Sequence, residues 1–285
     1  MNERQTILSQ ATFESIPRHV FERAVGEVTR FSTILVLDGK LAGSGTFIKC
    51  GDLYGILTAH HVVHNPKDPA RRFTFTGTQK LALLIDTRAH LFEIDVCACR
   101  CVDIGTPVAE ETGPDLSVIL LPAPRLGTLK AKKDFYNISA STDQKCQKAV
   151  SDHGFFIFNG SPACMSNDMR TPGGTGRNLF VPVVGACSKI VKRYNSGPFD
   201  FVELNVSYHT QSEAVESFAG MSGGGLWRIP LMKHLSESID KVTFNEVVLA
   251  GVGFYQTAIE CDTRSIRCHG GRSVFTETVR ALLAA

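Results

Sequence analysis

Three short stretches of the sequence carry residue types that could act together in acyl transfer. The pair His60 and His61 directly follows an apolar run, and histidine is the side chain whose ordinary pKa suits proton transfer near neutral pH. Asp115 precedes the apolar run 116–121, where a carboxylate can orient a histidine. Ser222 lies in the stretch Gly-Met-Ser-Gly-Gly-Gly, whose glycines permit a sharp turn and a close approach of substrate. A base, an orienting carboxylate and a nucleophile are what catalysis by a serine requires.

These residues must be held by elements that the hydrophobic pattern predicts to be mostly β-strands. Short apolar runs alternate with Asp-Gly, Gly-Asp, Gly-Thr and Asn-Pro pairs, a pattern typical of sandwiches and barrels rather than of a parallel α/β sheet. The same pattern predicts a helix over 11–24 and a second helix over 273–285, with Ser273 as its N-cap. A polar, glycine-rich exposed loop is predicted over 166–178.

Length and composition are those of a folded globular protein. The chain has 285 residues, of which 43% are hydrophobic and 20% are charged. A chain of this length can bury a core without disulfides or metals. Its net charge of +2 predicts neither a nucleic-acid partner nor an anionic membrane. No apolar run reaches the ~18 residues of a membrane span, and the N-terminal stretch lacks a signal-peptide pattern. We therefore expect a cytoplasmic protein whose 9 cysteines are reduced thiols.

In the order His61, Asp115 and Ser222, the three stretches resemble the catalytic motifs of the trypsin/chymotrypsin-like serine peptidases. The matching phrases are Leu-Thr-Ala-His-His-Val-Val, Asp-Leu-Ser-Val-Ile-Leu-Leu and Gly-Met-Ser-Gly-Gly-Gly. The resemblance covers roughly residues 28–257 and is closest to bacterial Deg/HtrA-like and other intracellular trypsin-like peptidases. Each phrase alone is moderately specific, whereas all three in this order are strongly so.

The resemblance implies an all-β fold, a chymotrypsin-like double β-barrel with short N- and C-terminal helices and an active site between the barrels. The first barrel would supply the histidine and the aspartate, and the second barrel would supply the serine. The predicted divisions of this single peptidase domain are an N-terminal helical segment over 1–27, the first barrel over 28–124, a connector over 125–150, the second barrel over 151–258, and a C-terminal loop and helix over 259–285.

The resemblance also implies a role for each residue of the site. His61 rather than His60 would be the general base, Asp115 would orient it, and Ser222 would be the nucleophile. The backbone N–H groups of Gly220 and Ser222 would form the oxyanion hole. The predicted activity is that of a serine protease, a hydrolase that cleaves peptide bonds through a catalytic triad and an acyl-enzyme. Its partner would be a protein or peptide substrate, and no cofactor or metal is expected.

In this family, residues shortly before the serine line the primary specificity pocket, and a later strand adds a wall. Here these substrate-binding candidates are Glu216, Ser217, Phe218, Ala219 and Phe254. A carboxylate at the base of the pocket would favour Arg or Lys before the scissile bond. Glu216 can equally be an exposed loop residue, so both interpretations stay open.

Two positions depart from the pattern of the secreted family members. Met221 stands where activatable members carry an aspartate that pairs with a newly cut N-terminus, so that switch is not expected. Gly225 replaces a usual proline, a change that we expect the fold to tolerate. Regulation would then come from ordering of the loops 166–178 or 211–219, or from an activating protein partner. The alternative function is a latent or inactive protease-fold protein that binds such a partner or needs one for activity.

The same serine also fits a second hydrolase fold in part. The Gly-x-Ser-x-Gly spacing around Ser222 also fits the nucleophile elbow of α/β-hydrolases, and His234 and His269 follow it. That fold needs the acid and the histidine after the serine, on an alternating βα pattern that this sequence lacks.

Two groups of residues have partial metal-ligand patterns. Cys97, Cys99 and Cys101 would share one face of a strand, and we expect core thiols there because structural zinc sites usually space cysteines more widely. His60 and His64 have the spacing of the zinc-peptidase helix but lack its glutamate.

Overall fold

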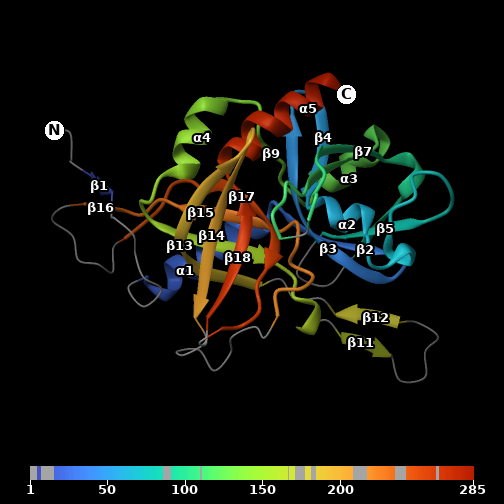
Figure 1. Ribbon diagram of the computed structural model, residues 1–285, viewed down its shortest axis with the longest axis horizontal. Coiled ribbons are helices and arrows are strands. Elements are labelled where there is room, and N and C mark those ends of the chain that lie inside the picture. The colour runs from blue at the N-terminus through green and yellow to red at the C-terminus, as the bar shows by residue number, and fades with distance from the viewer. Residues whose placement is uncertain are drawn as a thin grey trace.

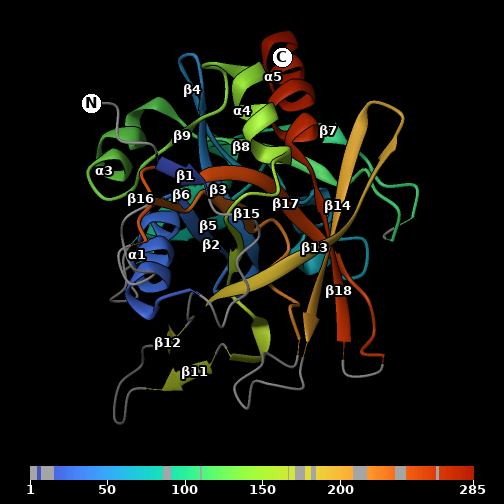
Figure 2. The ribbon, with the colours of Figure 1, turned by 90° about the vertical axis from the view of Figure 1, so that its left-hand side faces the viewer.

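The computed structural model describes residues 5–7, 16–85, 91–109, 111–165, 167–170, 177–180, 184–207, 217–234, 242–260 and 263–285. This described part consists mostly of antiparallel β-strands in two main sheets that lie side by side (Figure 1). The C-terminal helix lies at one end of both sheets in the two perpendicular views (Figure 2).

The first sheet contains eight strands, and His61 and Asp115 lie beside the ends of two neighbouring strands within it. Its strands are β2 (Ser32–Leu37), β3 (Lys40–Cys50), β4 (Leu53–Thr58), β5 (Lys80–Leu84), β6 (Leu91–Asp95), β7 (Arg100–Gly105), β8 (Leu116–Leu120) and β9 (Tyr136–Asn137). They pair in the order β6-β5-β2-β3-β4-β8-β7, and β9 adds to β3 in parallel. β4 pairs antiparallel with β8 so that Thr58 lies opposite Ser117. This register brings together the chain segments that hold His61 and Asp115.

The second sheet closes on itself as a six-stranded barrel. Its strands are β10 (Phe155–Gly160), β13 (Val184–Ser196), β14 (Phe199–Ser207), β15 (Gly225–Ile229), β17 (Val248–Gln256) and β18 (Thr263–His269). They pair antiparallel in the ring β10-β13-β14-β18-β17-β15, and β15 returns to β10. Two short sheets complete the described strands: β1 (Gln5–Ile7) with β16 (Met232–His234), and β11 (Asn167–Arg170) with β12 (Arg177–Phe180).

Helices cover the outside of the sheets. They are α1 (Arg18–Thr29), α2 (His60–His64), α3 (Leu126–Lys130), α4 (Thr142–Val150) and α5 (Thr278–Ala284), with short turns at Pro69–Arg71, Val96–Ala98, Ala123–Arg125 and Ala163–Met165 and a π-helical turn at Ser273–Glu277. On α1, Val20, Ala24 and Val28 recur every fourth residue and form the buried face. Among the described helices, none has the length and apolar character needed to cross a membrane.

One aromatic cluster joins the two sheets. Trp227 on β15 is fully buried, and its ring stacks on Phe31, which precedes β2, at 5.3 Å between centroids. Tyr136 on β9 meets the same indole edge-on at 5.4 Å. Because large aromatic side chains dominate the burial energy of a core, this cluster fixes the two sheets against each other.

The fold class agrees with the prediction at the level of two mostly antiparallel sheets with helices near both ends of the chain. The second sheet forms a barrel, whereas the first sheet ends at β6 and β7 without a pairing between them in the described residues.

Two predicted segments have a different structure. The N-terminal helix spans Arg18–Thr29 rather than 11–24, because Pro17 occupies its N-cap and the apolar stripe continues to Val28. Residues 8–15 lie outside the described ranges. The connector 125–150 contains α3, β9 and α4.

The predicted C-terminal loop contains a barrel strand, β18. The sequence Thr-Arg-Ser-Ile-Arg-Cys-His does not look strand-like because its partly exposed positions include Arg264 and Arg267, while only Ile266, Cys268 and His269 are buried. Strand formation there depends on hydrogen bonds from β14, which lies in a distant part of the sequence, and from β17, the strand that directly precedes it. The predicted boundary at residue 259 therefore cuts the second barrel.

Ser273 is not the N-cap of the C-terminal helix. Helical structure begins at 271, and the carboxylate of Asp200 accepts the N–H groups of Arg272 at 3.0 Å and Ser273 at 2.7 Å. An acid from a distant strand thus takes the capping role that the local serine was expected to have. The predicted loop 166–178 includes strand β11 and the start of β12, and 171–176 lie outside the described residues.

Candidate active site

His61 and Asp115 meet at the edge of the first sheet. His61 lies on α2, which begins two residues after β4 ends, and Asp115 lies directly before β8. The Asp115 carboxylate accepts two hydrogen bonds from the histidine: Oδ1 from the backbone N–H at 2.9 Å and Oδ2 from Nδ1 at 2.5 Å. A proton on Nδ1 leaves Nε2 as the basic nitrogen, so the contact orients the ring and selects its tautomer.

The environment of Asp115 favours its charged form. The side chain is only 1% exposed, and this burial alone would raise its pKa. The hydrogen bonds and charge of His61 act in the opposite direction and hold the pKa of Asp115 below its usual value. A buried carboxylate that stays ionised can stabilise an imidazolium on His61.

A second histidine, His269 at the end of β18, also contacts Asp115, through the backbone. Its Nε2 accepts the backbone N–H of Asp115 at 2.9 Å, so that nitrogen carries a lone pair and the ring is neutral. Burial lowers the pKa of His269 to about 4, although the charges of Asp115 and Asp200 raise it. The ring is packed against Phe201 and Phe254, at 5.1 and 5.0 Å between centroids.

Ser222 lies in a tight turn that only glycine neighbours permit. Gly220 and Gly223 have φ of +90° and +86°, a region that other residues rarely adopt. A Cβ atom on Gly223 would overlap Thr58 Oγ1 and the Ser44 carbonyl, so the first sheet packs directly against this turn. The glycine-rich stretch therefore serves both the turn and its close contact with β3 and β4.

The backbone N–H groups of this turn divide into two sets. Most of those from 218 to 224 donate to protein acceptors: the N–H groups of Phe218, Ala219, Met221, Gly223 and Gly224. Those of Gly220 and Ser222 have no acceptor among the described residues. Both residues line the pocket that contains His61. Two unpaired donors beside a serine are the arrangement that an oxyanion hole needs.

Ser44 on β3 ties this turn to the first sheet. Its backbone N–H donates to the carbonyl of Ser222 at 2.9 Å, and its hydroxyl donates to the carbonyl of Gly220 at 2.9 Å. The same hydroxyl accepts the N–H of Ser161 at 3.0 Å, and Thr58 Oγ1 donates to the Ser44 carbonyl at 2.8 Å. Ser44 was not among the predicted site residues; its only local signal is its position between two glycines.

A pocket of about 440 Å³ connects the site residues. His61, Gly220 and Ser222 line it together with Phe158, Phe218, Ala219, Phe254 and Ile266, and Asp68 and Arg71 also contribute. No hydrogen bond joins the Ser222 hydroxyl to His61 in the described structure. Such a bond is often long or absent until substrate binds.

The predicted specificity residues have separate outcomes. Phe218, Ala219 and Phe254 line the pocket. Ser217 does not, because its hydroxyl accepts the N–H of Ala219 at 3.2 Å and the side-chain amide of Gln256 at 3.1 Å. Glu216 lies outside the described residues.

The three cysteines of the Cys-x-Cys-x-Cys stretch do not share one strand face. Cys97 lies in the turn Val96–Ala98 and is exposed, Cys99 follows the turn and is buried, and Cys101 lies on β7 and is half-buried. The prediction of core thiols holds for Cys99 alone, because a 3-10 turn interrupts the expected alternation. All three are free thiols.

Neither a protein-family model nor a curated protein sequence matches this chain. The geometry of the site therefore carries the functional proposal.

Proposed function

We propose that this protein is a serine endopeptidase of the trypsin/chymotrypsin-like type, with His61, Asp115 and Ser222 as its catalytic triad. One observation carries the proposal: His61 is held by Asp115 through Nδ1 and lines a pocket with Ser222, whose own N–H and that of Gly220 lack acceptors among the described residues. Base, nucleophile and oxyanion donors thus lie around one cavity.

In the proposed reaction, Ser222 Oγ attacks the carbonyl carbon of a peptide bond and His61 Nε2 takes the hydroxyl proton. Asp115 stabilises the imidazolium that results. The oxyanion accepts hydrogen bonds from the N–H groups of Gly220 and Ser222. His61 then protonates the leaving amine, the acyl-enzyme forms, and water activated by His61 hydrolyses it.

The arrangement of the strands supports a chymotrypsin-like double barrel. His61 and Asp115 come from the first sheet and Ser222 directly precedes β15 of the second, so the site lies where the two sheets meet. In such a fold each sheet would carry one part of the site, and a clamp such as Ser44 would set their relative position. A cytoplasmic location remains a prediction from the sequence.

The lining of the pocket favours an apolar side chain before the scissile bond. Phe218, Phe254 and Ile266 line it and are buried, whereas its charged lining residues, Lys67, Asp68 and Arg71, come from the segment after α2. Cleavage after Arg or Lys would instead be favoured by a carboxylate, either that of Glu216 at the pocket base or that of Asp68, which lines the pocket.

A latent peptidase is the alternative, and it is favoured by the missing hydrogen bond between Ser222 and His61. In that case an activating protein partner would bring the two side chains together. Adding the partner would then produce turnover without any change in the residues of the site.

The test is hydrolysis of an unfolded protein substrate, with the new termini identified by mass spectrometry. Wild type should cleave it, and Ser222→Ala should lose on the order of 10⁴–10⁶ in rate. Ser265→Ala is the matched control and should cleave as wild type does, because this serine of β18 does not line the pocket and its hydroxyl donates to Asn205. Cleavage by Ser222→Ala at the wild-type rate would refute the proposal.

A further inference from the structure

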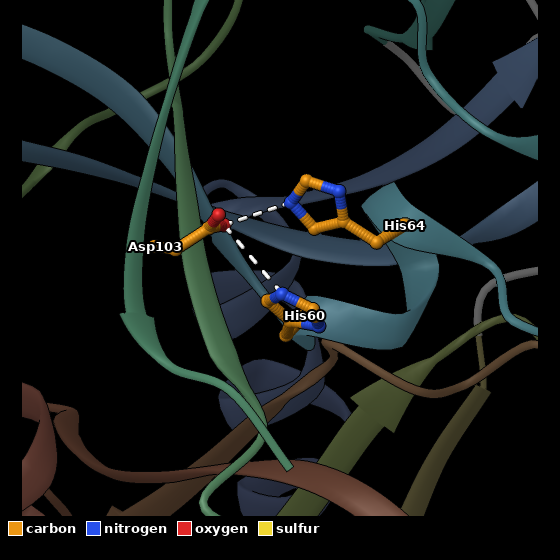
Figure 3. A group of neighbouring side chains, drawn as sticks. All are labelled: His60, His64 and Asp103. Atoms are coloured by element: carbon orange, nitrogen blue, oxygen red, sulfur yellow. Dashed lines mark hydrogen bonds and ion pairs between the residues drawn. The ribbon is translucent and has the colours of Figure 1, made fainter.

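Next to the candidate triad, three metal-ligand side chains converge on one point (Figure 3). His60 and His64 lie at the two ends of α2, one helical turn apart, and therefore project from the same face of the helix. Asp103 faces them from β7. The two imidazole rings stack at 4.2 Å between centroids, with 29° between their planes. None of the three lines the pocket that holds His61 and Ser222.

The distances within this cluster are close to those of a metal site. Asp103 Oδ1 lies 2.9 Å from His64 Nε2 and 3.9 Å from His60 Nε2. All three ligand atoms lie within 4.8 Å of one another. With Zn–N bonds of about 2.0–2.1 Å, two ligands of a tetrahedral zinc are about 3.3 Å apart. The 2.9 Å and 3.9 Å distances lie on either side of that value, so side-chain shifts of about half an ångström would bring these two pairs to it, and the two Nε2 atoms lie within the 4.8 Å limit.

A fourth ligand and an outer support are also present. Cys101 Sγ on β7 lies 3.3 Å from Asp103 Oδ1 and 4.0 Å from His64 Nε2. Ser117 Oγ on β8 donates to Asp103 Oδ1 at 2.7 Å, the kind of second hydrogen bond that orients a ligating carboxylate. Imidazole, carboxylate and thiolate together are a ligand set typical of zinc.

The exposure of the three residues fits a site that exchanges its ion with solvent. The His60 side chain is 13% exposed, that of His64 32% and that of Asp103 41%. The Nε2 atom of His60 points toward the Asp103 carboxylate (Figure 3). At 3.9 Å from Oδ1, however, it is too far away for a hydrogen bond. A metal ion would give this nitrogen a partner.

We propose that His60, His64 and Asp103 bind a divalent zinc-class cation, with Cys101 as the fourth ligand. On binding, His64 gives up the Nε2 proton that it donates to the Asp103 carboxylate and takes the tautomer with a proton on Nδ1, so the cation can take the lone pairs of both Nε2 atoms and of Asp103 Oδ1. The Cys101 thiol releases its proton to solvent and ligates as a thiolate. The ion plays no part in peptide hydrolysis; it ties α2 to β7. Because His61 lies on α2, the ion would hold the histidine of the candidate triad in place.

Titration of the metal-free full-length protein with Zn²⁺, followed by calorimetry, tests this inference. Wild type should bind one equivalent and unfold at a higher temperature with Zn²⁺ than with a chelator. His64→Asn and Asp103→Asn should each weaken Zn²⁺ binding by a factor of at least about 10–100. Removing a residue that only hydrogen-bonds to a metal ligand already causes a loss of this size. Wild type that binds no Zn²⁺, or variants that bind it as tightly as wild type, would overturn the proposal.

Surface thiols are the main competing ligands, so the control is a variant with Cys97→Ser and Cys164→Ser, two exposed cysteines outside the cluster. This control should keep the full affinity; loss of binding in it would overturn the assignment. Co²⁺ reports the ligand set directly through its visible absorption. A tetrahedral spectrum with a thiolate charge-transfer band that Cys101→Ser removes would support the fourth ligand, whereas an unchanged band would overturn that part.

The readouts remain informative if a variant folds poorly or the peptidase proposal fails. The Zn²⁺-dependent shift in unfolding temperature is measured on wild type alone, with no substitution. Metal binding does not require a reactive Ser222, so Ser222→Ala should bind Zn²⁺ as wild type does. Zinc binding without proteolysis would leave this inference standing and refute only the proposed function.

Discussion

Ser44 and Ser222 are joined by a backbone hydrogen bond of 2.9 Å that links the first sheet to the turn of the candidate nucleophile. The hydroxyl of Ser44 adds a second bond, to the carbonyl of Gly220, at 2.9 Å. Both carbonyls belong to the residues whose N–H groups would bind the oxyanion. Because a peptide group is planar, the N–H of Gly220 shares a plane with the Ala219 carbonyl, which accepts the N–H of Ala163 at 2.6 Å, and the N–H of Ser222 shares a plane with the Met221 carbonyl, which accepts the N–H of Gly224 at 2.8 Å. The two bonds from Ser44 fix the next peptide group after each of these, so together they hold the turn in one conformation.

Ser44→Ala should weaken catalysis more than binding. The substitution leaves the partly buried Gly220 carbonyl and the buried Ser161 N–H without their partner, which should cost about 1–3 kcal/mol of unfolding free energy. The turn should become less well ordered, so kcat falls while KM changes little. Steady-state kinetics and urea unfolding measure the two effects. A variant with lower stability but wild-type kcat would show that Ser44 is only structural.

Gly223→Ala should unfold or inactivate the protein, whereas Gly51→Ala should be tolerated. Both glycines have positive φ, +86° and +58°, so both substitutions impose about 1–2 kcal/mol of backbone strain. Only at Gly223 would the new Cβ overlap Thr58 and Ser44; at Gly51 nothing lies within 4 Å. The additional cost at Gly223 should bring the loss to at least about 3 kcal/mol. Equal destabilisation of the two variants in urea titrations would contradict this packing.

His269 should make the protein less stable in mild acid. Its pKa is lowered to about 4 in the folded state, against about 6.5 in an unfolded chain. Between these values the unfolded state binds more protons, so the free energy of unfolding falls as the pH drops from about 6.5 to about 4. The contribution is fully present above that window, and the slope from this group is at most about 1.4 kcal/mol per pH unit.

His269→Gln removes this titration and keeps a side-chain acceptor for the N–H of Asp115. The dependence of unfolding free energy on pH should be shallower in the variant across the same window. His153→Gln, at an exposed histidine, is the control and should retain the wild-type slope. Identical slopes for wild type and His269→Gln would mean that His269 is not the buried neutral group described here.

Peptides that differ only in the residue before the scissile bond should be cleaved fastest after Phe, Leu or Met. The pocket is lined by Phe218, Phe254 and Ile266, and apolar burial there is worth roughly 1.5–3 kcal/mol for a full side chain. Relative kcat/KM values across the panel measure the preference. Faster cleavage after Arg or Lys, abolished by Glu216→Gln, would instead support the carboxylate at the pocket base.

Local signals in the sequence were sufficient for part of the site. The strand-ending apolar run before His61 and the single acid before the run 116–121 predicted the two residues that the structure brings together. The glycines around Ser222 predicted a tight turn, and the structure gives two of them positive φ. Each of these features depends on residues that are close together in the sequence, so the sequence pattern indicates it directly.

Residues that act over long sequence separations were not predictable in this way. Ser44 contacts Gly220 across 176 positions, and Asp115 contacts His269 across 154. The cluster of His60, His64 and Asp103 likewise joins α2 to β7, so the spacing of His60 and His64 alone could not indicate Asp103. Strand β18 was missed in part for the same reason, because one of its two ladder partners, β14, lies in a distant part of the chain, whereas the other, β17, directly precedes it. Tertiary pairing rather than local propensity determines each of these cases.

Labelling with a fluorophosphonate probe tests the central claim most directly, because such probes need an aligned base, nucleophile and oxyanion hole together. We expect a covalent adduct on Ser222 of the folded wild type, mapped by peptide mass spectrometry. Labelling should persist in Ser265→Ala and disappear in Ser222→Ala, and it should be strongly reduced in His61→Ala. Wild type that stays unlabelled, or labelling that survives Ser222→Ala, would contradict the account.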